Sequence, residues 1–213
     1  MADQIVVERS DRGLGLAPAK TGQPIDQWVN LLNKAGVTTV AFKEYEAMKW
    51  SKALLNIVGN ATSAILNRPP GVVYKSDVMF DLEVRMLRET LKVMDALKLD
   101  VVDLPGSPAG RLAFGVRRAP KMVLKPILTS LVAKGRGEKM PSFQIDLMAG
   151  KGQSEVVFHN GAIAKAGVAQ CIPMPVNTAL TDVLLRLTRH ELDWRDFDGK
   201  PSRLLAEVER FEN

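Results

Sequence analysis

The segment KWSKALLNIVGNATSAIL, residues 49–66, carries the side chains of this sequence that are best suited to chemistry. With successive residues about 100° apart on a helix, its polar residues and its glycine fall within an arc of roughly 100°, and nearly all the others are apolar. An ammonium group can transfer a proton, and amide and hydroxyl groups can orient a polar substrate by hydrogen bonding. The stripe consists of Lys49, Lys52, Asn56, Gly59, Asn60 and Ser63.

Two interpretations of this stripe follow from the pattern alone. A helix that is apolar over most of its circumference should be largely buried, and a buried ammonium or amide costs several kcal/mol unless it is paired. On that interpretation the stripe lines a cleft. Alternatively, the segment is a surface helix whose single wet face carries two lysines and two asparagines. The residues by themselves leave both interpretations open.

Other helices must position the stripe, and the apolar periodicity predicts them along most of the chain. Turns rich in proline and glycine separate these helices, and no internal repeat of 20 to 50 residues is present. The predicted helices span residues 44–66, 78–97, 121–133, 154–169, 177–190 and 202–211. The sequence therefore predicts a mainly α fold.

The first 46 residues have a different pattern. Two short strands are predicted at 4–8 and 14–18, followed by a helix between Pro24 and Gly36 and a third strand at 37–40. We therefore expect two domains, a small α/β unit over residues 1–46 and a helical domain over residues 47–213.

Composition narrows the class of protein. A chain of 213 residues that is 46% hydrophobic and 25% charged is expected to fold and to dissolve in water. No run approaches the roughly 18 apolar residues of a membrane span, and the charged beginning MADQIVVERSDR is unlike a signal peptide, so we expect a cytoplasmic protein. Cys171, the only cysteine, is expected to be a small buried hydrophobe, and His159 and His190 to be structural or surface residues, so no metal site is predicted.

The net charge of +5 is compatible with an anionic small molecule or with nucleic acid. Much of the excess lies in residues 111–139, where aromatic residues are too sparse for a platform on which bases could stack. We interpret this run as a solvated face and do not expect a nucleic-acid partner; steeply salt-dependent binding to DNA or RNA would contradict that expectation.

Residues 50–60, WSKALLNIVGN, resemble the W-x-K-x-x-x-N-x-x-x-N signature that opens the helical domain of ketopantoate reductases. Four further segments resemble motifs of that family in the same order, and the resemblance covers most of the chain. They are SFQIDL at 142–147, SEV at 154–156, NG at 160–161 and IPMPVN at 172–177.

The resemblance implies a helical domain like the carboxyl-terminal domain of 6-phosphogluconate dehydrogenase, preceded by the end of a Rossmann domain. It implies an oxidoreductase of pantothenate biosynthesis that reduces a 2-keto acid, ketopantoate to pantoate, with NADPH. Lys52 would be the catalytic acid, partly desolvated against Trp50, and Asn56, Asn60 and Ser142 would bind the substrate. Glu155 would accept a hydrogen bond from the substrate's hydroxyl group.

The sequence also departs from the family. The G-x-G-x-x-G fingerprint is missing, and Pro18 stands where a third glycine would follow Gly13 and Gly15, so we do not expect a phosphate-binding loop there. Val157 replaces the acidic residue usual two places after the glutamate, and Glu155 could simply stabilise a helix start. An alternative function is therefore a non-catalytic or split-enzyme module that self-associates or needs a separate dinucleotide-binding subunit.

Overall fold

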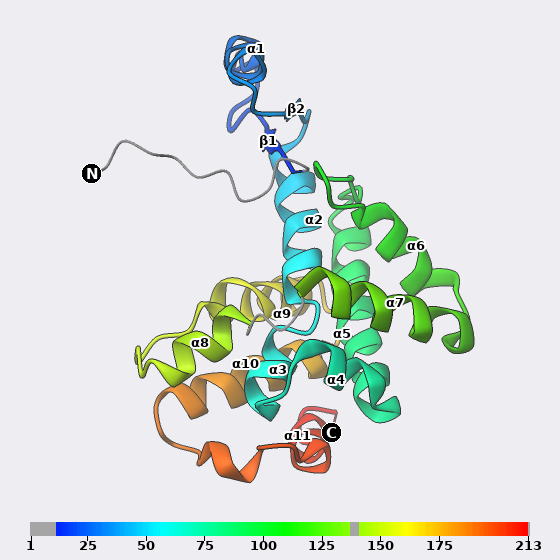
Figure 1. Ribbon diagram of the computed structural model, residues 1–213, viewed down its shortest axis with the longest axis vertical. Helices are drawn as coiled ribbons and strands as arrows, with labels where there is room; N and C mark the ends of the chain where they lie inside the picture. The colour runs from blue at the N-terminus through cyan, green and yellow to red at the C-terminus, as the bar shows by residue number, and fades with distance from the viewer. Residues whose placement is uncertain (1–11, 137–140, 213) are drawn as a thin grey trace.

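The computed structural model describes residues 12–136 and 141–212, and within them the fold is mainly α. Figure 1 shows a small α/β unit at one end of the molecule, from which α2 leads into a group of packed helices. The predicted fold class is thus confirmed, whereas the domain boundary after residue 46 stays a prediction.

The α/β unit pairs two short parallel strands, β1 (Leu14–Leu16) and β2 (Thr39–Ala41), joined through helix α1 (Asp26–Lys34). Asn33 fastens the helix to the second strand, because its amide donates to the Thr39 carbonyl at 3.0 Å and accepts from the Thr39 N–H at 2.9 Å. Both strands lie within or beside the ranges predicted for them. The strand predicted at 4–8 falls outside the described residues.

The prediction of a single helix at residues 44–66 is wrong. The chain forms α2 (Tyr45–Ile57) and α3 (Ala61–Leu66), separated by a turn at residues 58–60. Gly59 has a φ of +60°, a conformation that glycine adopts without steric cost, and a side chain there would approach the Pro70 Cβ to 3.1 Å. The helical projection therefore holds only up to Ile57.

Most of the other predicted helices are found with ends shifted by one to three residues. Three α-helices and one 3-10 helix of the described residues were not predicted, at 70–75, 109–118, 142–148 and 194–196. The helix predicted at 154–169 divides at His159, whose backbone (φ −110°, ψ −97°) is not helical. The remaining elements are α4 (Pro70–Lys75), α5 (Asp77–Ala96), α6 (Ala109–Arg118), α7 (Lys121–Arg136), α8 (Ser142–Met148), the 3-10 helix η1 (Glu155–Phe158), α9 (Asn160–Ala169), α10 (Pro175–Thr188), the 3-10 helix η2 (Trp194–Asp196) and α11 (Pro201–Glu209).

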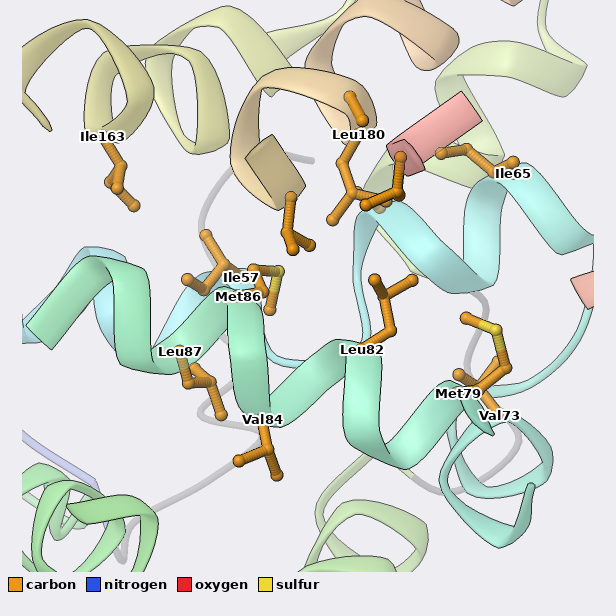
Figure 2. Close-up of a cluster of buried hydrophobic side chains, with 14 of the residues drawn as sticks. Ile57, Ile65, Val73, Met79, Leu82, Val84, Met86, Leu87, Ile163 and Leu180 are labelled. Atoms are coloured by element: carbon orange, nitrogen blue, oxygen red, sulfur yellow. The ribbon is translucent and has the colours of Figure 1, made fainter. Parts of the chain in front are cut away.

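Helix α5 is the centre of the core. Its 20 residues include twelve buried ones, and the cluster in Figure 2 brings side chains of α2, α3, α4, α9 and α10 together around it. Burial of this apolar surface is the main source of stability of such a fold. No helix within the described ranges is long and apolar enough to cross a membrane.

Candidate functional site

Lys52 and Asn56 lie one turn apart on α2, so their side chains share a face of that helix. Lys52 is exposed and Asn56 is half-buried. The opposite face is buried through Ala47, Ser51, Leu54 and Ile57, and the Ser51 hydroxyl accepts a hydrogen bond from the Val102 N–H at 2.9 Å.

The expectation of a largely buried helix is therefore wrong for α2, which buries one face, and right for α3, whose residues are all buried. The physical reason is the turn at Gly59, which directs the second half of the segment into the core. The partial desolvation expected for Lys52 is likewise not provided by the described residues, among which its side chain is exposed.

Asn60 and Ser142, which are 82 positions apart in the chain, meet in the structure. The turn at Gly59 brings Asn60 inward, where it is 5% exposed, and its Nδ2 lies 3.4 Å from the Oγ of Ser142, the first residue of α8. Helix α8 packs against α3, and Gln144 donates to the Asn67 side chain at 2.8 Å to fix this contact. Two of the predicted substrate-binding residues are thus brought together.

A buried hydrogen-bonding group next to this contact has no protein partner among the described residues. It is Oδ1 of Asn60, and whichever way the amide is turned, one of its two polar atoms faces Ser142 and the other lacks a partner. The Oγ of Ser63, three residues later on α3, is also buried and unpartnered there. Because buried polar groups are nearly always hydrogen-bonded, these atoms are suited to a polar ligand.

Glu155 begins η1, and its side chain is exposed. The preceding Ser154 caps this short helix by accepting a hydrogen bond from the Val156 N–H at 3.3 Å, so a helix-start role for Glu155 is available as well. Neither Glu155 nor Lys52 forms an ion pair with any described residue. The nearby Lys151 forms an ion pair with Asp146, and the hydrogen bond between them raises the pKa of the Lys151 ammonium group.

A pair of aromatic rings links the segment of Ser142 to that of Glu155. Phe143, next to Ser142, packs on His159, four residues after Glu155, with ring centroids 5.6 Å apart. Burial lowers the pKa of the His159 imidazole, and the negative charge of Glu155 acts in the opposite direction. His159 therefore lies at the junction of the two segments, and its Nδ1 is buried without a partner among the described residues.

Two asparagines in the motif segments belong to the core and not to the site. Asn177 donates to Glu89 on α5 at 2.7 Å, and Asn160 donates to Asn177 at 3.0 Å. Glu89 also accepts the N–H groups of Val176 and Asn177, each at 2.9 Å, which anchors the start of α10. Burial raises the pKa of Glu89, against the effect of these hydrogen bonds.

Sequence reasoning missed Glu83 and Glu89, the buried carboxylates of α5. Their signal was available, since both fall among the apolar positions of a long amphipathic helix, where a charged side chain requires hydrogen-bond donors around it.

Gly13 and Gly15 are explained by packing. A side chain at Gly13 would collide with the Thr38 carbonyl, and one at Gly15 would meet the Phe42 ring at 2.8 Å. Helix α1 begins only at Asp26, so this segment is not a glycine-rich turn that leads directly into a helix.

Two surface cavities, of about 390 and 690 Å³, are lined by none of the predicted site residues. The first is lined by residues around His190 and Trp194 and the second by residues around Phe114 and Arg118. Within the described ranges no cluster of His, Cys, Asp and Glu could hold a metal ion. Cys171 is exposed and not buried as expected, because it occupies a turn with a φ of +55°.

Residues 44–188 match the family model for the carboxyl-terminal domain of ketopantoate reductases (PanE/ApbA). The chain belongs to the ketopantoate reductase family. The matched range contains Lys52, Asn56, Asn60, Ser142 and Glu155, so all the predicted site residues lie in the part that defines the family.

Individual relatives agree with this assignment. A 2-dehydropantoate 2-reductase of Pyrobaculum aerophilum is 28% identical over 154 residues, which are 72% of this chain and 48% of that protein. Another from Pyrococcus horikoshii is 27% identical over 101 residues, which are 45% of this chain and 34% of that protein. The chain thus spans at most about half the length of these relatives.

Solved structures show the same fold. The ketopantoate reductase of Ralstonia eutropha JMP134 superposes with a TM-score of 0.64 at 24% identity, over 84% of this chain and 52% of that one. A D-mandelate dehydrogenase with NADH and anilino(oxo)acetate has a TM-score of 0.60 at 18% identity, over 83% of this chain and 85% of that one.

The lowered pKa of His159 predicts a pH dependence of stability. Below pH 6.5, the ordinary imidazole pKa, His159 binds a proton in the unfolded chain but stays neutral in the folded chain. The free energy of unfolding should therefore fall as the pH falls from 6.5 toward the folded-state pKa. His159→Leu should reduce this loss, and His190→Asn, in an exposed turn, should retain it. Urea denaturation at pH 7.5 and 5.5 measures both; an unchanged difference in His159→Leu would contradict the prediction.

Proposed function

We propose that this chain is the substrate-binding portion of a ketopantoate-reductase-like oxidoreductase that reduces a 2-keto acid, ketopantoate to pantoate, with NADPH when the enzyme is complete. The observation that carries the proposal is the junction of Asn60 and Ser142, two residues of separate family motifs, which lie 3.4 Å apart beside a buried polar atom without a partner. Family membership supplies the reaction class.

The polar groups of the site have separate roles in this proposal. Asn60 and Ser142 hydrogen-bond the substrate, with Asn56 on the adjoining turn of α2. Glu155 accepts a hydrogen bond from the substrate's hydroxyl group. The Lys52 Nζ donates a proton to the ketone oxygen as that oxygen becomes an alkoxide, and positioning by the other groups contributes much of the rate.

Lys52 must be shielded from water for this role, because proton transfer to an alkoxide is most effective where water is excluded. Its side chain is exposed among the described residues, so the substrate and a second protein surface must enclose it. The same requirement applies to Ser142 and Glu155, which are exposed at the starts of their helices.

NADPH would supply hydride to the ketone carbon. The segment of Gly13 and Gly15 does not fit its pyrophosphate, because both glycines are occupied by strand packing and no helix starts directly after them. The roles given to Lys52, Asn60 and Ser142 do not depend on where the cofactor is held.

A second candidate function is a binding module that docks a separate dinucleotide-binding polypeptide or a second copy of itself. Within the described residues β1 and β2 pair only with each other, and α1 buries none of its side chains. Trp28 and Leu31 on α1 are 55% and 57% exposed. Sheet edges and apolar faces of this kind are usually covered in the working protein. In either function, the cytoplasm is the location that we propose.

The second candidate predicts association through this α/β unit. Sedimentation velocity from about 1 to 100 µM, the usual range of weak interfaces, should show dimers of the chain, or a complex with a dinucleotide-binding polypeptide. Replacing Trp28 and Leu31 by Lys should abolish association, whereas Val168→Lys, at an exposed position of α9, should not. A monomer at all concentrations, with no affinity for such a polypeptide, would contradict this candidate.

Calorimetric titration of the chain tests the proposed substrate. Pantoate or ketopantoate should bind without cofactor, and Asn60→Ala should weaken binding about tenfold, the effect of losing roughly 1.4 kcal/mol of hydrogen bonding. Asn30→Ala, an exposed asparagine on α1, is the matched control. Tight NADPH binding would mean that the chain binds its own cofactor. No detectable binding of pantoate, ketopantoate or NADPH would favour the binding module.

Lys52 is tested in an active enzyme, either reconstituted with a dinucleotide-binding partner or joined to one. Lys52→Ala should lower kcat by about 10² to 10⁴, the usual contribution of a general acid. Lys49→Ala is the matched control, because Lys49 is exposed one turn earlier on the same helix, and its kcat should change little. Activity retained in Lys52→Ala would remove the central claim of the proposed mechanism.

A further inference from the structure

Glu83 is a buried carboxylate that none of the roles above uses. It lies on α5 with 0% exposure, and its Oε2 accepts the Gly59 N–H at 2.9 Å and the Tyr74 hydroxyl at 2.7 Å. Its Oε1 accepts the Thr62 hydroxyl at 2.5 Å. The carboxylate therefore holds residues on both sides of Asn60.

The turn that Glu83 holds decides where Asn60 lies. If α2 continued as a regular helix, Asn60 would stand one turn beyond Asn56 on the same face. The left-handed backbone at Gly59 instead directs Asn60 into the contact with Ser142, where its side chain is buried. The Gly59 N–H, which turns away from the helical pattern here, finds its acceptor in Glu83.

The chemistry of this contact favours one geometry. Each oxygen of Glu83 has a hydrogen-bond partner in the turn or on α3, so the carboxyl group is bound at two points of the same segment. A buried carboxylate cannot exchange these donors for water without a large cost. The turn is therefore held to the central helix of the core and not only by its own backbone.

We propose that Glu83 is a positioning residue of the substrate site, which acts through the Gly59 turn to fix the orientation of the Asn60 amide. The role in substrate binding rests on the proposed function, whereas the effect on Asn60 itself does not. Glu83 does not touch the substrate in this arrangement.

Glu89 provides a matched control for the test. It is a second buried carboxylate on α5, 8% exposed, and it also accepts several hydrogen bonds, but it holds the start of α10 and not the turn beside Asn60. In Glu83→Gln an amide NH₂ group opposes the donors of the turn, and in Glu89→Gln the same change opposes the donors of α10. Both variants should be less stable than the parent.

The experiment compares the parent chain, Glu83→Gln and Glu89→Gln at a temperature at which all are folded. The readouts are the ¹H–¹⁵N signal of the Asn60 side-chain amide and the Kd of pantoate by calorimetry. We expect Glu83→Gln to shift the Asn60 signal and raise Kd about tenfold, and Glu89→Gln to do neither. Tyr74→Phe removes one hydroxyl donor to Glu83 and should shift the Asn60 signal less than Glu83→Gln does. It replaces Glu83→Gln in the test if that variant does not fold.

The outcomes separate the two proposals. The positioning role would be overturned if the Asn60 signal were the same in Glu83→Gln as in Glu89→Gln, even if the parent binds pantoate. The same holds for Tyr74→Phe where it replaces Glu83→Gln. If the parent does not bind pantoate, the proposed substrate is overturned. If the Asn60 signal nevertheless shifts in Glu83→Gln, the positioning of Asn60 by Glu83 stands.

Discussion

The structure depends on how α5 satisfies polar groups inside an apolar core. This helix lies at the centre of the apolar core, yet it carries Glu83 and Glu89 among its buried positions. Each carboxylate accepts hydrogen bonds from a place where another helix ends or begins: Glu83 from the turn between α2 and α3, and Glu89 from the start of α10. Terminal N–H groups of helices need acceptors, and α5 supplies them from within the core.

The candidate site follows from the first of these contacts. Because the chain turns at Gly59, Lys52 and Asn56 stay on the outer face of α2 while Asn60 enters the core and meets Ser142. The site is thus half outside and half inside the helical domain. In the proposed mechanism a second surface encloses the exposed half, and Trp28 and Leu31 are further exposed apolar side chains on α1.

Motif residues of one family can serve different physical purposes. Asn60 and Ser142 meet where two helices pack, whereas Asn177 binds Glu89 and the Nδ2 of Asn160 donates to Asn177 deep in the core. The Oδ1 atoms of Asn60 and Asn160 are both buried without a partner among the described residues. All four lie in segments that resemble the family. Their place in the fold, together with their hydrogen-bond partners, distinguishes residues that could bind a substrate from residues that hold the helices in place.

The sequence by itself determined the mainly helical fold, the small α/β unit at the start and the family, because apolar periodicity, glycine and proline positions and motif order are local properties of the chain. The parallel pairing of β1 with β2 is known only from the tertiary structure. The sequence did not determine the turn within residues 44–66, where the Gly59 N–H donates to Glu83, 24 positions away. Nor could it show that Lys52 is exposed or that Asn60 reaches Ser142, which depends on how α3 packs against α8. Burial and hydrogen bonds between distant residues are set by packing, and only the tertiary structure decides them.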